Sequence, residues 1–487
     1  MRATSSDDFV RDPIGSYPSA TVACFDATRG DLPRRALDAD RMVDFLERLA
    51  RLGAPAVLIA ASTGHGHLRT VEELQQWFGV AARAQLGRTV RIALLRPEDG
   101  VDANRRLLDV LRDGNYPIVF VRPGRDLPAH ASDEQISANV AGVVSAAAER
   151  GFAVGVYSIP DVSGVRLTAA ATAMLLDAPG GDRIVAAKIT ESNYEQSTLQ
   201  FLTHPRLRRL KIVQGWDPFL ARALRDGPRH DDQGRQRCGI TSGPMSFAVY
   251  QYLHLLEQAE RGDWDEFQQA QAAVTTLFQS MQDDPARFAD LQRAKQIMGL
   301  GEPLLGTVSP DSVERVLQAL AELGREPDRR RLAMSLDLMQ DGPYHDRLRR
   351  WTDVDSTTTV AELRSLVRDF VADRNWEQFH APKNLAMALM VEVAELMEHF
   401  QWLSIDDSRS IANDPRRRAA IREELADVFG YTLALANELD LDIASAVFDK
   451  MLKNAAKYPV SEYHGRYSKD DQRPTVIADK DNRSSEV

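Results

Sequence analysis

Eight short apolar runs, separated by amphipathic helical patterns, are the feature that most limits how this chain can fold. Between residues 19 and 262 the runs are ATVACF, AVLIAAS, TVRIALL, YPIVFV, AVGVYSIP, RIVAAKIT, LKIVQG and RQRCGITSG. Their nearly continuous apolar character is typical of parallel strands that are buried on both faces. Eight strands, each followed by a helix, over about 250 residues match a (β/α)8 TIM barrel. A doubly wound open sheet is the alternative, but no GxGxxG follows the first run.

The rest of the chain divides by pattern into three further parts. Helical patterns continue the barrel, so that the first domain is expected over 1–325 as an α/β TIM barrel with C-terminal helices. Residues 326–357 are densely charged and only weakly periodic, which indicates a linker. Residues 358–460 show helical periodicity without a strand pattern and predict a separate all-α helical bundle. The tail, 461–487, is rich in Lys, Asp, Ser and Arg and is expected to be disordered.

Composition limits the partners and the compartment. The 487 residues carry 60 Lys+Arg against 71 Asp+Glu, a net charge of −11, which argues against a nucleic-acid polymer as ligand. The two cysteines, Cys24 and Cys238, stand far apart and exclude a disulfide framework or a cysteine zinc site. We expect both to be buried and reduced, as in the cytoplasm. The polar start MRATSSDDFVRDP does not resemble a signal peptide, and no apolar run approaches the ~20 residues of a membrane span.

Two pairs of carboxylates stand on the predicted helices of the second domain. Glu392 and Glu395 occur in MALMVEVAELMEHFQW, with Glu398 one step further, and Glu424 and Asp427 occur in AAIREELADVFGY. Residues three apart share a helix face, so each helix presents two acids side by side. Two solvated acidic faces are the plain interpretation. Because the surrounding residues are apolar, we favour four converging carboxylates that bind Mg²⁺, which takes oxygen ligands and bridges phosphates.

These carboxylates carry a resemblance to a known family. ExxE followed by ExxD after 28 intervening residues, with RNWEQFHAPKNLA before, FQW between and KMLKNAAKYP after, resembles the all-α nucleotide pyrophosphohydrolases of the MazG and dCTP pyrophosphatase group. The resemblance covers nearly all of 358–460 and is closest to the dCTP pyrophosphatase branch. It implies Mg²⁺-dependent hydrolysis of a nucleoside triphosphate, such as dCTP, to the monophosphate and pyrophosphate. It also implies a homo-oligomer, a dimer or tetramer, whose sites are completed by helices of neighbouring subunits.

The resemblance also assigns residues to roles. Magnesium would be bound by Glu392, Glu395, Glu424 and Asp427, with Glu395 or Glu424 orienting the attacking water. The triphosphate would be contacted by Lys453, Asn454, Lys457 and Tyr458. The base pocket would be formed by Trp376, His380 and Trp402. The alternatives are that the tryptophans are core aromatics, that the histidine is an ordinary core or surface residue, and that the lysines only favour the helix dipole.

A lysine and a tyrosine carry the chemistry of the predicted barrel. Lys188 interrupts the apolar run RIVAAKIT, and burial would lower its pKa and leave a neutral amine suited to Schiff-base formation. Tyr157, at the end of AVGVYSIP, would be the nearby acid/base. The plain alternatives are that the strand ends at Ala187, with Lys188 pointing to solvent, and that Tyr157 is ordinary barrel packing.

These positions resemble the dihydrodipicolinate synthase/N-acetylneuraminate lyase family of Schiff-base aldolases over roughly 15–320. YSIPDVSGVRLT resembles its tyrosine motif and VAAKITES the motif around its lysine. ASTGHGHLRTVEEL resembles the carboxylate-binding turn, so Ser62 and Thr63 would hold the carboxylate of a 2-keto acid. GITSGPMSF resembles the glycine turn of strand eight and gives Gly239 and Ile240 as pocket backbone. The resemblance implies a covalent lysine Schiff base without a further cofactor in the barrel.

Three departures separate the chain from dihydrodipicolinate synthases. The usual Gly-Glu of the turn reads Gly-His at 64–65, the position of a relay tyrosine reads Pro-Gly-Arg at 123–125, and Val162 replaces an arginine. We therefore expect a lyase, aldolase or dehydratase that acts on another 2-keto acid. Two alternatives remain open: the two domains act on successive or related metabolites, or the barrel is a non-catalytic oligomerisation or ligand-binding module.

Overall fold

The computed structural model describes residues 5–28, 36–280, 292–302, 304, 310–321, 338, 342 and 358–466. The chain divides into two compact units, 1–353 and 354–487. Apart from residues 338 and 342, the predicted linker 326–357 lies outside the described residues, as does the predicted tail from 467 onward. The first residues of that tail belong to a short helix, α22 (Val460–Tyr463).

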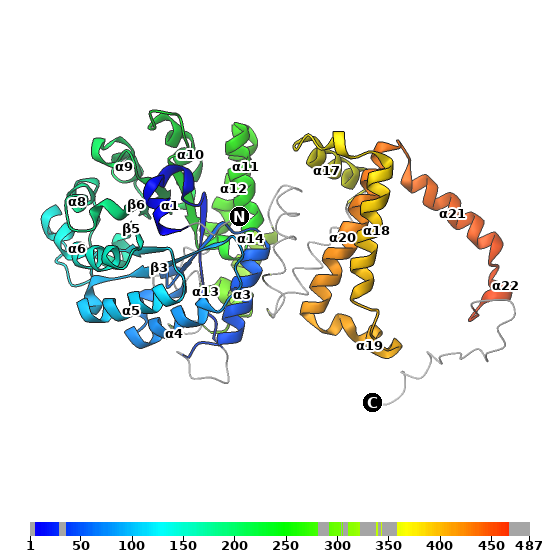
Figure 1. Cartoon of the computed structure of the whole chain (residues 1–487), viewed down its shortest axis with the longest axis horizontal. Coiled ribbons are helices and arrows are strands. Elements are labelled where there is room, and N and C mark those ends of the chain that lie inside the picture. The colour runs from blue at the N-terminus through cyan, green and yellow to red at the C-terminus, as the bar shows by residue number, and fades with distance from the viewer. Residues whose placement is uncertain are drawn as a thin grey trace. The chain divides into compact units, whose positions relative to one another are not determined.

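The first unit is a closed barrel of eight parallel strands in the order β1 to β8 (Figure 1). Each strand pairs with the next along the chain, and β8 returns to β1, where Ile240 lies opposite Ala20. The TIM barrel is thus confirmed and the open sheet is excluded. The strands are β1 (Ala20–Ala23), β2 (Ala56–Ile59), β3 (Val90–Leu95), β4 (Ile118–Val121), β5 (Ala153–Ser158), β6 (Ile184–Ile189), β7 (Lys211–Gln214) and β8 (Cys238–Ser242).

Helices follow the strands and cover the outside of the barrel. Side-chain caps begin several of them: Thr70 and Glu73 form a capping box at α4, and Ser132 and Gln135 form one at α6. The helices of this layer are α3 (Ala39–Arg51), α4 (Val71–Ala82), α5 (Val101–Asp113), α6 (Asp133–Glu149), α7 (Pro160–Ser163), α8 (Ala169–Leu175), α9 (Thr198–Thr203), α10 (Leu220–Arg229) and α11 (Val249–Arg261). The C-terminal helices of the unit are α12 (Trp264–Gln279), α13 (Gln292–Ile297) and α14 (Pro310–Ala321).

The N-terminal segment closes one end of the barrel. It forms α1 (Ser6–Arg11) and α2 (Pro13–Ser16), and Phe9 packs with Tyr17 against the interior residue Phe120. The Ser6 hydroxyl donates a hydrogen bond to the carbonyl of Pro117, just before β4. Because this contact lies at the amino ends of the strands, the carboxyl ends remain for a site, as in TIM-barrel enzymes.

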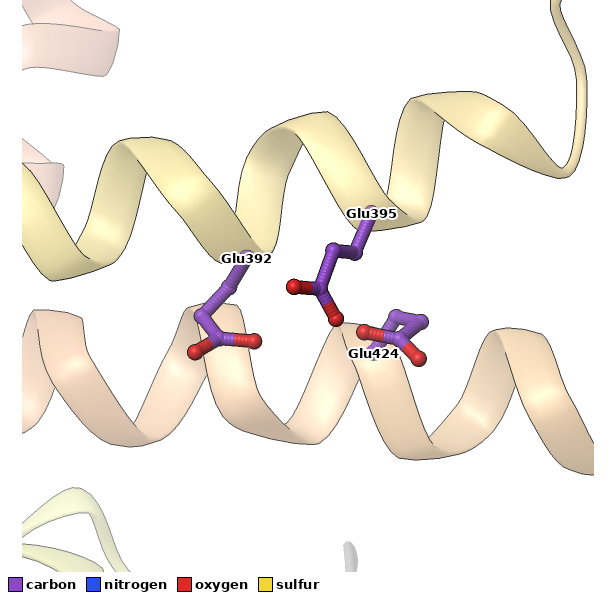
Figure 2. A group of neighbouring side chains, drawn as sticks. All are labelled: Glu392, Glu395 and Glu424. Atoms are coloured by element: carbon purple, nitrogen blue, oxygen red, sulfur yellow. The ribbon is translucent and has the colours of Figure 1, made fainter.

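The second unit is all helical in its described part, 358–466. Its helices are α17 (Val360–Ala372), α18 (Pro382–Glu398), α19 (Ile405–Ser410), α20 (Pro415–Glu438), α21 (Ile443–Lys457) and α22. The helices α18 and α20 lie side by side (Figures 1 and 2), and α17 is fastened to α20 by reciprocal hydrogen bonds between Arg364 and Asn437. The predicted separate all-α domain is therefore confirmed.

Two further expectations concern the thiols and the membrane. Cys24 and Cys238 are both buried and free, as predicted. Within the described ranges, no helix has the length and apolarity that crossing a membrane requires.

Candidate functional site

Three of the predicted acids gather between α18 and α20. Figure 2 shows Glu392 and Glu395 on α18 and Glu424 on α20, with their carboxylates in the space between the helices. One oxygen of each lies within 4.8 Å of the others. The i,i+3 spacing places the two glutamates of α18 on one face, and the packing of α18 on α20 brings the third opposite them.

The charges of this cluster act on one another. The pKa of Glu392 is raised by partial burial and by the negative charges of Asp427, Glu395 and Glu424. Asp427, the fourth predicted ligand, thus acts on the cluster electrostatically, although it is not one of the three carboxylates that meet within 4.8 Å. The site offers only oxygen donors, and their negative charges repel one another. Such a site suits a hard divalent cation such as Mg²⁺.

The predicted phosphate-binding residues lie on a helix that leaves this site. Within its own chain α21 buries no side chain, and Figure 1 shows it extending away from α18 and α20. Its end carries the predicted residues Lys453, Asn454, Lys457 and Tyr458. A single chain therefore does not bring these residues to the three glutamates.

The predicted base-pocket residues are also dispersed. Trp402 follows α18 and is 88% exposed, so the alternative that it is a core aromatic is wrong. Trp376 is 43% exposed, with its ring edge-on to Phe370 at 5.8 Å between centroids, and His380 ends the short turn Glu377–Phe379. Within one chain the two tryptophan side chains therefore face solvent.

Large apolar side chains are exposed on several helices of the second unit, and many of them lie on α18, α20 and α21. Soluble monomers rarely expose contiguous apolar patches of large area. On α21 the exposed residues fall at helical spacing and form one stripe. The exposed residues are Met387, Met390, Val391, Val393 and Met397 on α18, Leu425 and Phe429 on α20, and Val447, Phe448, Met451 and Leu452 on α21.

In the barrel, Lys188 and Tyr157 meet inside the carboxyl ends of neighbouring strands. The β5–β6 register pairs the two residues, and the Lys188 Nζ lies 4.3 Å from the centroid of the Tyr157 ring. Lys188 is 4% exposed, so the alternative that it points to solvent is wrong. Burial lowers its pKa to about 7, against the opposing effect of Asp217. Within the described residues its Nζ has no hydrogen bond or ion pair, which leaves the amine available as a nucleophile.

Tyr157 is a buried phenol that keeps its proton. Its hydroxyl donates a hydrogen bond to Thr190 Oγ1 at 3.2 Å, and burial raises its pKa above the ordinary value. The phenol is therefore neutral at physiological pH. Thr190, which the sequence analysis did not select, follows β6 directly and is a second hydroxyl at this site.

The predicted carboxylate-binding turn lies between β2 and α4. Ser62 and Thr63 begin the turn Ser62–Gly64 and are buried, and the Ser62 Oγ has no hydrogen-bond partner among the described residues. A Cβ at Gly66 would lie 1.9 Å from the carbonyl oxygen of Ala60, so the turn requires glycine there. A buried, unpartnered hydroxyl in a rigid turn fits a ligand oxygen.

The two predicted residues of β8 are placed differently from each other. Gly239 lies beside Lys211, the first residue of β7, and is therefore towards the amino ends of the strands. Ile240 packs in the hydrophobic layer outside the barrel. The next inward position is Thr241, whose Oγ1 is buried without a partner in the described part of the chain and whose methyl group would contact a Cβ at Gly215.

Asp217 is the clearest residue that the sequence analysis missed. It follows β7, is 1% exposed, and accepts hydrogen bonds from Ser242 Oγ at 2.8 Å and from the hydroxyl of Tyr252. Burial raises its pKa to about 6. An acid directly after strand seven, in LKIVQGWDPF, was the available signal, because TIM-barrel sites are built at such positions.

The structure also shows where the residues lie that depart from the dihydrodipicolinate synthase pattern. Arg122, at the end of β4, is fully buried and pairs with Glu98, while Arg125 is exposed. Val162 is buried with the interior residues. His65 is buried in a left-handed conformation, with its ring 5.8 Å from that of His67. At the carboxyl ends of the strands, the guanidinium of Arg122 and the imidazole of His65 are therefore buried, whereas Arg125 is exposed.

Comparison with known proteins finds relatives for much of the helical unit. Residues 387–471 match the MazG-like family. The chain is 47% identical to dCTP pyrophosphatase 1 of Mus musculus over 102 residues, which are 21% of this chain and 60% of that protein. It is 46% identical to dCTP pyrophosphatase 1 of Homo sapiens over 101 residues, 21% of this chain and 59% of that protein. The chain thus spans about three fifths of the length of these relatives.

The barrel matches solved structures in fold. Dihydrodipicolinate synthase from Aquifex aeolicus aligns with a TM-score of 0.51 at 16% identity, over 62% of this chain and 97% of that one. A variant of 2-keto-3-deoxygluconate aldolase from Sulfolobus solfataricus aligns with a TM-score of 0.52 at 14% identity, over 66% of this chain and 100% of that one. At these identities the likeness is one of fold.

Proposed function

We propose that the chain is a bifunctional enzyme, whose helical unit hydrolyses a nucleoside triphosphate, such as dCTP, to the monophosphate and pyrophosphate. The observation that carries this proposal is the meeting of Glu392, Glu395 and Glu424 within 4.8 Å on a MazG-like domain. The similarity to dCTP pyrophosphatase 1 supports the substrate class.

We assign the roles of the residues from their charge and from the resemblance to the nucleotide pyrophosphohydrolases. Glu392, Glu395 and Glu424, with Asp427 beside them, would hold Mg²⁺, which when bound offsets phosphate charge and makes water a better nucleophile. Glu395 or Glu424 orients the water and accepts its proton. Lys453 and Lys457 offset the remaining charge of the triphosphate. The indole faces of Trp376 and Trp402 stack on the base.

We further propose that this site is completed in a homo-oligomer, a dimer or tetramer. The lysines of α21 lie away from the acids of their own chain, and α21 buries no side chain there. The apolar stripe of α21 would pack on the exposed apolar residues of α18 and α20 in a second copy. This packing would cover both apolar surfaces and bring the lysines of α21 close to the glutamates of the second copy.

The test is pyrophosphate release from a panel of nucleoside triphosphates with and without Mg²⁺. We expect Mg²⁺-dependent release with a preference for dCTP, and loss of activity in Glu395→Gln and in Glu424→Gln. Release of single phosphates would contradict the reaction type. Full activity in both variants would contradict the site.

For the barrel we propose Schiff-base lyase or aldolase chemistry on a 2-keto acid. The supporting observation is the buried amine of Lys188, 4.3 Å from the Tyr157 ring and without an ion pair within the described residues. Lys188 would attack the keto carbon, Tyr157 would transfer the proton, and the hydroxyl of Ser62, with Thr63 beside it, would bind the carboxylate. The two free, buried cysteines support a reducing, cytoplasmic location.

Borohydride trapping tests this second activity. Incubation with pyruvate or another 2-keto acid, followed by reduction, should add the mass of the reduced acid to the peptide that contains Lys188. Tyr157→Phe should slow turnover and keep part of the adduct. If a broad panel of 2-keto acids gives no adduct, the barrel is a non-catalytic module.

A further inference from the structure

A buried charge cluster joins one of the C-terminal helices of the first unit to the carboxyl end of β1. Asp26 follows β1, and its Oδ1 accepts a hydrogen bond from the Nζ of Lys295, on α13, at 2.9 Å. Its Oδ2 accepts another from the guanidinium of Arg69. The side chains of all three residues are 0% exposed. Although burial acts to raise the pKa of the Asp26 carboxyl, the charges of Lys295 and Arg69 lower it, so the carboxylate is ionised.

The segment that contains α13 is fastened to the same part of the barrel by its backbone. The amide of Thr28 donates a hydrogen bond to the carbonyl of Leu300 at 2.8 Å. Arg41, on α3, donates to the carbonyl of Gly299 at 2.7 Å. The described segment 292–302 therefore lies against the loop that follows β1, at the end of the barrel where TIM-barrel sites are built.

The predicted carboxylate-binding turn is built directly on this cluster. A Cβ at Gly64 would lie 3.0 Å from the amide nitrogen of Asp26, so the turn packs on that backbone. Arg69 ends the second short turn, Gly66–Leu68, and its guanidinium returns to the Asp26 carboxylate. Asp26 thus holds both halves of the turn. The hydroxyl of Ser62, two residues before Gly64, is carried by the backbone that is fixed in this way.

Such a cluster contributes more to geometry than to stability. A buried ion pair gains little net stability over apolar residues of the same volume, because desolvation offsets the attraction of the charges. Its charge-assisted hydrogen bonds are directional, however, and they fix the groups that they join. A hydroxyl that binds a carboxylate must be held within about 0.5 Å of its productive position. A cluster that fixes the backbone beside Ser62 can supply this precision.

We propose that Lys295 is a positioning residue: through Asp26 it fixes the turn that binds the carboxylate of the keto acid. The inference rests on the proposed Schiff-base function and deepens it. It makes the segment 292–302, which lies outside the eight β/α units, part of the substrate-binding site. Lys295 acts through the turn and does not itself contact the keto acid.

The first experiment measures the turn in the full chain without any keto acid. In hydrogen exchange followed by mass spectrometry, peptides that cover residues 61–70 report on the turn, because its amides donate to carbonyls within it. In Lys295→Met these peptides should exchange at least about tenfold faster, because the buried carboxylate of Asp26 loses one of its two cations. Lys295→Arg keeps the charge and should restore slow exchange in part.

Lys211→Met is the matched control. Lys211, the first residue of β7, is also buried, and its Nζ donates to a backbone carbonyl at 2.7 Å, at the amino ends of the strands. Its loss should leave the exchange of 61–70 unchanged. Equal acceleration in both variants, or none in Lys295→Met, would overturn the proposal. If Lys295→Met does not fold, Arg41→Leu decides: it frees the carbonyl of Gly299 and should accelerate the same peptides by a smaller factor, and an unchanged rate would overturn the proposal.

A second experiment measures the binding of the keto acid. Cyanoborohydride traps pyruvate on Lys188, and the trapping rate is followed against pyruvate concentration. Lys295→Met should raise the half-saturating concentration about tenfold, the scale of a lost hydrogen bond to a charged group. The rate at saturation should change little, because the turn follows β2 whereas Lys188 and Tyr157 belong to β6 and β5. Ser62→Ala should have the same effect, and combining it with Lys295→Met should add little, because both changes act through one hydroxyl.

The two experiments separate this inference from the function on which it rests. Faster exchange of the turn in Lys295→Met, without a keto-acid adduct in the wild-type protein, would refute the lyase and support the coupling of Lys295 to the turn. An adduct whose half-saturating concentration is unchanged in Lys295→Met would support the lyase and refute the positioning role. Additive effects of Lys295→Met and Ser62→Ala would refute that role as well.

Discussion

Removing one carboxylate from the three-glutamate cluster should stabilise the metal-free helical unit while abolishing its activity. Two unit charges 4.8 Å apart repel by about 0.9 kcal/mol in a water-like medium, and salt at physiological strength reduces this by about half. Glu395→Gln removes two of these pairs and keeps the side-chain size. The expected gain in the free energy of unfolding is up to about 1 kcal/mol, larger at low salt.

Magnesium should reverse this order. A ligand at 100 times its dissociation constant stabilises the folded state by about 2.7 kcal/mol. The wild-type cluster should gain stability on this scale, and Glu395→Gln should gain less because it has lost a ligand charge. The variant should therefore be the more stable protein in chelator and the less stable one in Mg²⁺.

Hydrogen exchange followed by mass spectrometry measures the local stability of α18 and α20 in the full chain, from peptides of these two helices. Glu398→Gln is the matched control, because Glu398 is an exposed acid on the same helix outside the cluster and should change neither stability nor activity. A Glu395→Gln protein that exchanges faster than wild type in chelator would refute the electrostatic reasoning. Equal protection of both proteins by Mg²⁺ would refute the metal site.

Three further outcomes are expected. Lys188→Met should raise the melting temperature most below about pH 7, and the gain should shrink towards about pH 10. The reason is that the lowered pKa of the buried lysine destabilises the folded state until the lysine of the unfolded chain also loses its proton. Equal gains at both pH values would contradict this. Light scattering should give a multiple of the 54.2 kDa chain mass, and Phe448→Asp should shift it towards the monomer and abolish pyrophosphate release. Trp402→Ala should raise KM for dCTP more than it lowers kcat in steady-state assays; an unchanged KM would remove Trp402 from the base pocket.

The fold could be predicted because its signals are local and repeated. The strands of the barrel are buried on both faces along most of their length and form apolar runs in the sequence, and the helix starts carry caps such as Thr70 and Ser132. The acidic cluster on α18 and α20 could also be predicted, because i,i+3 spacing places Glu392 and Glu395 on one face of a helix independently of the rest of the chain.

What the sequence could not predict depends on contacts between distant segments. Asp217 is recognisable as a buried, hydrogen-bonded acid only through its contacts with Ser242 and Tyr252, which belong to a later strand and a later helix. The register of β8 places Gly239 near the amino ends and points Thr241 inward, which a motif match does not specify. The exposed position of Trp402 likewise follows from how α18 ends, and the aromatic residue itself gives no sign of it.

We propose that the helix α21 links assembly of the oligomer to the chemistry of the second unit. Its apolar residues Val447, Phe448, Met451 and Leu452 share one face, while helical spacing turns Lys453 and Lys457 to another. If the apolar face is seated on α18 and α20 of a second copy, the two lysines are left at the edge of that contact, where they can reach anions at the glutamates. The free chain then holds acids without cations, a poor site for a triphosphate, and the assembled protein holds both. Activity should therefore rise more steeply than protein concentration wherever the oligomer dissociates, a dependence that a site complete within one chain does not produce.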